Sequence, residues 1–130
     1  MSCRVIAPKS LYKLDIDEGT VELTIPNGIK AALKPNCIPE SVTKITFSDD
    51  YNYELLPDVL PKGLTHLIFG RSFNKEIKPN VLPNSLTHLT FGAWFNQEIK
   101  PDVLPNSLTH LVLVNDIDIF VPNQVGLNMT

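Results

Sequence analysis

The chain has 130 residues, a mass of 14.5 kDa and a formal net charge of -3, which indicates one domain large enough to bury a hydrophobic core. Hydrophobic residues make up 43% of the sequence and charged residues 19%, which excludes a disordered acidic tail and a membrane protein. The 11 Lys and Arg residues of this acidic chain are too few for a nucleic-acid-binding surface.

Residues 1–16 are expected to form an N-terminal cap strand. Residues 12–16 alternate in polarity and lead through residues 17–20 into a β-friendly run that begins at Val21, a pattern typical of a β-hairpin. The first residues lack the long apolar stretch of a signal peptide, and Cys3 and Cys37 lack metal-ligand spacing. We therefore expect reduced cysteines and a cytoplasmic location.

Residues 17–114 show a 22-residue period, which is marked by proline. Eight of the 11 prolines fall into two columns with this spacing, Pro35, Pro57, Pro79 and Pro101, and Pro39, Pro61, Pro83 and Pro105. A period of this length indicates a solenoid or another repeat architecture. About five units are in phase, and the first and last of them are degenerate.

Each unit contains one strand candidate. In residues 65–69, for example, Leu67 and Phe69 point one way, and His66 and Ile68 point the other. Two prolines within five residues exclude an α-helix from the second half of the unit. The sequence therefore predicts an all-β, helix-poor solenoid of about five turns with one parallel β-sheet.

Two kinds of column are predicted inside this solenoid. The core columns are Ile45, Leu67, Leu89 and Leu111; Phe47, Phe69, Phe91 and Leu113; Tyr51, Phe73, Phe95 and Ile117; and Leu55, Ile77, Ile99 and Val121. Beside them, Asn52, Asn74 and Asn96 form a structural ladder that is expected to hydrogen-bond turn backbone within and between units.

Three segments of the unit carry a family resemblance. Residues 86–91, Leu-x-x-Leu-x-Phe, resemble the first half of a leucine-rich repeat, while residues 82–87 and 95–99 resemble the FNIP repeat known from amoebae and their large DNA viruses. The resemblance implies a right-handed, leucine-rich-repeat-like fold and, for a viral protein, the host cytoplasm. Family members often join an F-box to the repeats, which implies a substrate-recognition arm in a ubiquitin pathway. Only about 16 residues precede the first unit here, so we expect a bare repeat protein or a fragment.

Residues 115–130 are expected to form a C-terminal cap strand and tail. Ile117 and Ile119 alternate with Asp116 and Asp118, which is typical of a terminal strand whose charges protect a sheet edge.

The outward sheet face carries the candidate binding residues. They are Thr65, His66, Ile68, Thr87, His88, Thr90, Thr109, His110 and Val112, together with Trp94 from a loop. His66, His88 and His110 fall at one position of successive units, so they are weak metal candidates or a solvated row copied with the repeat. Trp94 lies outside the core columns, and it is either packed on a cap or exposed as an anchor.

No serine, cysteine or glycine-rich motif of a known catalytic type occurs in the sequence, so neither enzymatic activity nor a cofactor is expected. We predict a protein–protein interaction module whose partner is an unidentified protein, with no nucleic acid and no membrane involved. The protein is expected to be a monomer or a weak homo-oligomer that associates through the solenoid ends. A structural or self-assembling solenoid is the alternative, and a metal protein ranks last.

Overall fold

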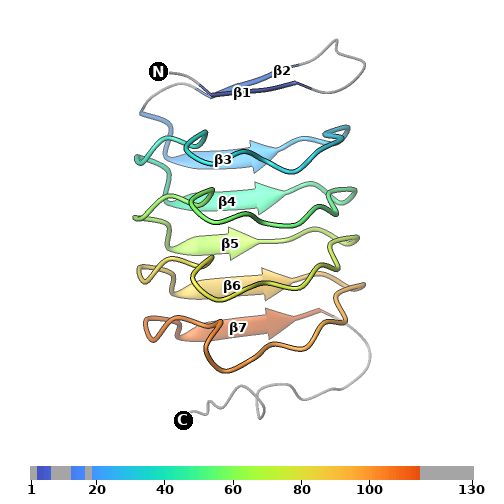
Figure 1. Cartoon of the computed structure of the whole chain (residues 1–130), viewed down its shortest axis with the longest axis vertical. Coiled ribbons are helices and arrows are strands. Elements are labelled where there is room, and N and C mark those ends of the chain that lie inside the picture. Colours follow the sequence, from blue (N-terminus) through green and yellow to red (C-terminus); the bar gives the residue numbers. More distant parts are fainter. Residues whose placement is uncertain (1–2, 7–12, 17–18, 115–130) are drawn as a thin grey trace.

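The computed structural model describes residues 3–6, 13–16 and 19–114, and residues 19–114 coil into a right-handed β-solenoid (Figure 1). Five strands form one parallel sheet in chain order, and the return paths run along the opposite side. These strands are β3 (Glu22–Ile25), β4 (Lys44–Phe47), β5 (His66–Ile68), β6 (His88–Phe91) and β7 (His110–Leu113). The helix-poor, leucine-rich-repeat-like fold is confirmed, with about four full turns between the first and the last strand.

The strands pair without any register shift. Each residue lies opposite its copy 22 positions away, as in the pair Leu67 and Leu89, and this register holds from β3 to β7. Alternation along each strand then places one set of side chains inside and the other outside. In β4 and β6, the second and fourth residues are buried while the first and third are partly exposed.

The two proline columns make two kinds of turn. In the second column the carbonyl oxygens of Pro61 and Pro83 accept hydrogen bonds of 3.2 Å from backbone N–H groups three residues later. In the first column each of three prolines precedes a residue with positive φ, namely Asn36, Asp58 and Asn80. Asn and Asp tolerate this left-handed conformation better than other non-glycine residues. Proline followed by such a residue reverses the chain as a type II turn does.

The core is a set of stacked columns. Phe47, Phe69 and Phe91 stack with ring centroids 5.2 and 5.4 Å apart, and Phe73 and Phe95 form a second stack beside them. The structure adds three buried columns that were not predicted: Ile38, Leu60 and Leu82; Val42, Leu64 and Leu86; and Val59, Val81 and Val103. Those positions follow the prolines in irregular backbone, where strand alternation makes no prediction.

Asparagine side chains connect successive turns beyond the C-terminal ends of the strands. The Oδ1 atom of Asn52 accepts a hydrogen bond of 2.8 Å from the backbone N–H of Asn74, and Asn74 accepts an equal bond from Asn96. The Oδ1 atom of Asn74 also accepts a bond of 3.0 Å from the side chain of Gln97. The column therefore satisfies backbone donors that the irregular turn would leave unpaired.

The N-terminal hairpin differs from the expectation. Strand β2 (Lys13–Ile16) pairs antiparallel with β1 (Cys3–Ile6), and not with the run that begins at Val21. The segment from Val21 instead supplies β3, which pairs in parallel with β4. A β-hairpin is therefore present at the N-terminus as expected, but the strand that pairs with residues 13–16 is Cys3–Ile6, whose Val and Ile favour β-structure, and not the segment from Val21.

The expectation of reduced cysteines is wrong as well, because Cys37 is disulfide-bonded and no described cysteine is free. Spacing along the chain does not determine which cysteines approach each other in space. The predicted C-terminal cap strand and tail, residues 115–130, lie outside the described residues. No helix in the described ranges is long and apolar enough to cross a membrane.

Candidate interaction face

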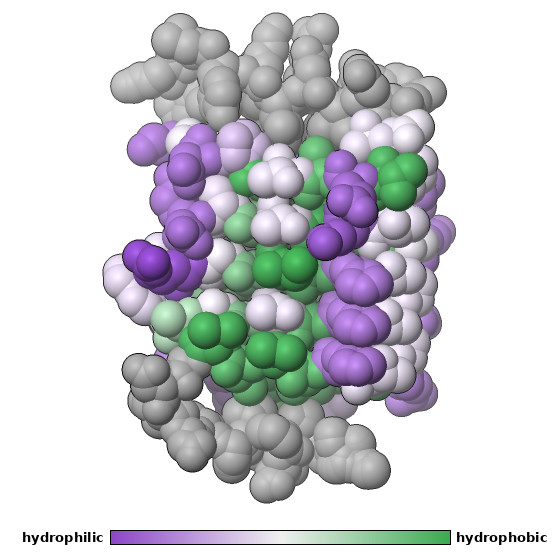
Figure 2. All heavy atoms as spheres, turned by 180° about the vertical axis from the view of Figure 1, so that it is seen from behind, coloured by the Kyte–Doolittle hydropathy of each residue, from purple (hydrophilic) through white to green (hydrophobic). Residues whose placement is uncertain are grey.

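The outward side of the sheet is a flat face built from three parallel rows, shown in Figure 2. The first row is Val21, Thr43, Thr65, Thr87 and Thr109; the second is Glu22, Lys44, His66, His88 and His110; the third is Thr24, Thr46, Ile68, Thr90 and Val112. We call this surface the sheet face. Among the described residues it brings together all the predicted binding candidates except Trp94.

The threonine and histidine rows are joined by repeated hydrogen bonds. The Oγ1 atom of Thr87 lies 2.8 Å from Nδ1 of His88, and the same distance separates Thr65 from His66 and Thr109 from His110. Each hydroxyl also lies 3.1 Å from the carbonyl oxygen of the threonine in the preceding strand. These bonds orient the three rings in the same way, so the row is a regular feature of the surface.

The central histidine has a perturbed pKa. Its ring lies between those of His66 and His110, with centroid distances of 4.3 and 4.2 Å. Loss of hydration lowers the pKa of His88, and repulsion from a charged His110 or His66 lowers it further. The imidazole of His88 is therefore more readily neutral than a free one.

Exposed apolar side chains lie at both ends of the sheet face: Val21, 53% exposed, at the N-terminal end, and a larger group at the C-terminal end. Val112 is 47% exposed and Val114 is 52% exposed, while Trp94, in the turn after β6, is 61% exposed. Of the two alternatives for Trp94, the structure gives the exposed one. A large aromatic side chain in this state resembles the anchors that dominate protein interfaces.

The other loop residues near this surface differ in exposure. Arg71 is exposed, and its carbonyl oxygen accepts a hydrogen bond from the backbone N–H of Trp94. Tyr53 is half-buried, and its ring stands edge-on against that of Tyr51 at a centroid distance of 5.5 Å. Arg71 can therefore extend a contact around Trp94, whereas Tyr53 belongs mainly to the core.

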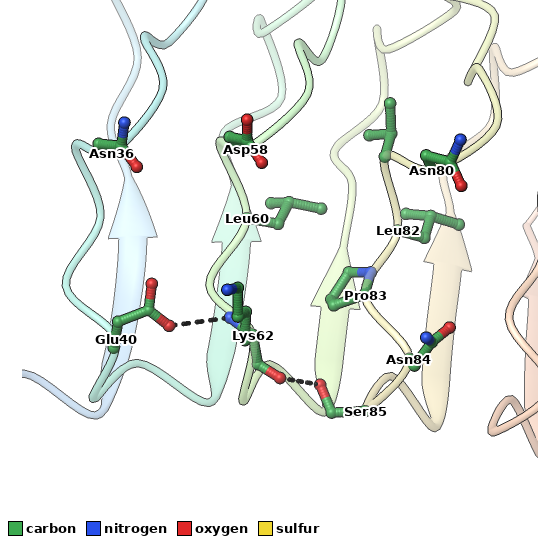
Figure 3. A pocket seen from close by; sticks show the side chains of 11 residues that line it. Asn36, Glu40, Asp58, Leu60, Lys62, Asn80, Leu82, Pro83, Asn84 and Ser85 are labelled. Atoms are coloured by element: carbon green, nitrogen blue, oxygen red, sulfur yellow. Dashed lines mark hydrogen bonds between the residues drawn. The ribbon is translucent and has the colours of Figure 1, made fainter.

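An open groove of about 510 Å³ lies among the proline turns, away from the sheet face (Figure 3). This groove was not predicted, although the Pro-Asn and Pro-Asp pairs that shape it are visible in the sequence. Its side chains largely serve the fold: Glu40 accepts a hydrogen bond from the backbone N–H of Lys62, and Ser85 donates to the carbonyl oxygen of Lys62. The polar groups of the groove thus mainly hydrogen-bond neighbouring turns to one another.

Side chains that can ligate a metal ion are not clustered in the described part of the chain. Within residues 19–114 and the two short N-terminal strands, no group of three or more His, Cys, Asp or Glu side chains could hold one ion. The three histidines form a line, and a line cannot surround a single ion.

Comparison with known proteins identifies the repeat. The model of the FNIP repeat matches the chain twice, over residues 30–72 and 73–116. A solved structure described as CroV588, a novel circular LRR protein, is 44% identical in sequence and superposes with a TM-score of 0.69. The match covers 76% of this chain but 15% of the CroV588 chain, so the present chain spans a small part of that protein's length. A comparison with curated proteins gives no significant match.

Proposed function

Because this chain belongs to the FNIP repeat family, we propose that it is a non-enzymatic repeat protein that binds a protein partner through the sheet face and the loop around Trp94. The observation that carries the proposal is the exposed Trp94, 61% accessible, beside the apolar end of a rigid β-surface. Extended faces of this kind are the surfaces that solenoid proteins use for binding.

The dimensions of the sheet face limit its affinity. Five strands spaced about 4.8 Å apart, each roughly 15 Å long, give a face of about 350 Å². A standard interface buries about 800 Å² on each partner. A firm complex therefore needs further area, which Trp94 and Arg71 can supply.

The test is comparative affinity capture from the native host, followed by direct titration of the captured protein. We expect Trp94→Ala and Ile68→Glu to weaken binding at least tenfold, because truncation of a central anchor costs about 2 kcal/mol or more. Lys75→Glu, an exposed charge change in the turn after β5, is the matched control and should bind like wild type. If Trp94→Ala and Lys75→Glu bind alike while both remain folded, the proposed surface is wrong.

The finer form of the proposal is that the chain recognises substrates for a ubiquitin pathway. Its support is the family resemblance alone. It predicts that ubiquitin-ligase subunits are captured together with the partner, and that the same Trp94→Ala change removes them.

A structural or self-assembling solenoid is the second candidate. The observation that favours it is the similarity to a protein described as circular, since the present chain corresponds to a short part of it. Light scattering over a hundredfold range of concentration distinguishes the two candidates: assembly requires a mass that rises with concentration, while an interaction module keeps the mass of one chain.

The cytoplasmic location is also a proposal. The disulfide bond of Cys37 is the observation that opposes it, because disulfides form and persist mainly in oxidising compartments. Microscopy of the tagged full-length chain in its native host tests the location directly.

A further inference from the structure

Three histidine rings form a continuous stack on the sheet face, and they are the only histidines in the sequence. The parallel register places His66, His88 and His110 directly opposite one another. Their planes are inclined by 9° and 7°, so the three rings present the same edge to solvent. With Nδ1 of each ring directed at a threonine hydroxyl, Nε2 is the nitrogen left for an external ligand.

The threonine row is suited to support a ligand on Nε2. When Nε2 binds a cation, Nδ1 carries the proton and needs an acceptor. The hydroxyl of Thr87, 2.8 Å from Nδ1 of His88, can accept it because its own proton has the carbonyl oxygen of Thr65 at 3.1 Å. This is the outer-shell arrangement in which a metal-bound histidine donates its second N–H to a fixed oxygen.

The spacing of the rings is slightly larger than the spacing that one bridging ion requires. Zn²⁺ binds imidazole nitrogen at about 2.0–2.1 Å, so two ligands on one ion lie at most about 4.1 Å apart. The ring centroids are 4.3 Å apart for His66 and His88 and 4.2 Å apart for His88 and His110. Because the ring planes are nearly parallel, both rings must rotate out of the stack before the in-plane lone pairs of their Nε2 atoms can point at the same ion.

Charge along the row favours its C-terminal pair. Lys44 precedes His66 in the row, and its ammonium group repels a cation bound beside it. His88 and His110 lie one and two strands further away.

We propose that the histidine row binds one divalent transition-metal ion, with Zn²⁺ as the reference case, through the Nε2 atoms of two adjacent histidines, His88 and His110 in preference to His66 and His88. Water completes the coordination, in agreement with the lack of any group of three or more ligating side chains among the described residues. His88 belongs to both pairs and can bind one ion at a time, so the capacity is one ion per chain. This site goes beyond the proposed protein-binding function and does not depend on it.

The experiment is calorimetric titration of Zn²⁺ into the untagged full-length chain at pH 7.5. We expect one site per chain. His88→Gln should abolish it because no adjacent pair remains, whereas His66→Gln should leave both the stoichiometry and the affinity nearly unchanged. His110→Gln should leave one weaker site, formed by His66 and His88 beside Lys44.

Two further variants make the test specific. The double variant His66→Gln/His110→Gln leaves His88 without a neighbour and should behave like His88→Gln. Thr87→Val removes the hydroxyl that accepts from Nδ1 and should weaken Zn²⁺ binding by about tenfold or more. Circular dichroism verifies that each variant is folded.

Two results would overturn the proposal. One is wild-type binding no stronger than that of the double variant. The other is an equal partial loss from each single histidine variant, which would mean three independent one-ligand sites. Nitrogen NMR of the imidazoles gives a second readout, since Zn²⁺ must give Nε2 of His88 the shift of a metal-bound nitrogen and Nδ1 that of a protonated one.

Discussion

At the scale of single residues, the clearest constraint is the backbone contact between successive turns at Gly70 and Gly92. A Cβ atom added at Gly92 would overlap the carbonyl oxygen of Gly70, and one added at Gly70 would overlap the carbonyl oxygen of Ser48. The overlapping atoms are backbone, which cannot rotate away as a side chain can. Glycine is therefore required here by close approach of the chain and not by an unusual φ.

We predict that Gly92→Ala destabilises the fold by about 1–3 kcal/mol or more, because the stacked turns must move apart to admit one methyl group. Chemical denaturation measures the change. Gly63→Ala is the control, since its added Cβ meets nothing closer than the carbonyl oxygen of Glu40 at 3.9 Å. Equal stability of the two variants would contradict this account of the turn.

Residues in the strands were easier to predict than residues in the turns. Leu67, Leu89, Phe69 and Phe91 are buried as expected, because alternation in a strand determines which side faces inward. The exposure of Trp94 could not be deduced in the same way. Trp94 lies in irregular backbone with no equivalent aromatic residue in the other units, so periodicity gives no information about its surroundings.

At the scale of elements, each strand or turn is stabilised chiefly by its copy in the neighbouring unit. The asparagine ladder shows this for the turns, because each Oδ1 serves a backbone N–H of the next unit rather than its own. The stacked phenylalanines show it for the core. A substitution in one unit should therefore also lower the stability of the adjacent unit.

Asn74→Ala tests this coupling. It removes the acceptor for the backbone N–H of Asn96 and for the side chain of Gln97, and we expect a loss of about 1 kcal/mol of stability. Hydrogen exchange should show that the amide of Asn96, one unit away, loses protection. Asn74→Asp keeps the Oδ1 acceptor and should restore most of that protection; a variant with unchanged exchange at Asn96 would show that the bond has no role.

The histidine row gives the sheet a pH dependence. The pKa of His88 is lowered in the folded state, first by loss of hydration and then by repulsion from its neighbours, so the unfolded chain takes up the proton more readily. Stability from a neutral His88 is complete above the usual imidazole pKa of about 6.5 and is lost as the pH falls below it.

We therefore expect the melting temperature to fall between pH 7.5 and pH 5.5, and to fall less in His88→Gln. The comparison with this variant separates the histidine from the carboxylates, which titrate at lower pH in both proteins. Identical falls in the two proteins would show that the stacked imidazole does not contribute.

At the scale of the whole molecule, the period of the sequence was sufficient to predict the fold. A 22-residue repeat with one alternating segment and two prolines admits little besides a helix-poor solenoid, and the parallel register follows from it. The ends were harder, because they depart from the period. The pairing of β1 with β2 and the disulfide bond of Cys37 depend on contacts that no repeat encodes. The histidine row was visible in the sequence, but its hydrogen bonds to threonine required the structure.

The unbroken register between strands also bears on how such a molecule changes in evolution. Duplication or deletion of one whole unit in the gene would leave every remaining interface between neighbours of the same kind, whereas an insertion of a few residues would break the register. The length of the solenoid can therefore vary only in steps of one strand, about 4.8 Å each. Each step would add or remove one residue from every row of the sheet face, so the reach of the surface and its number of ligand positions would change together.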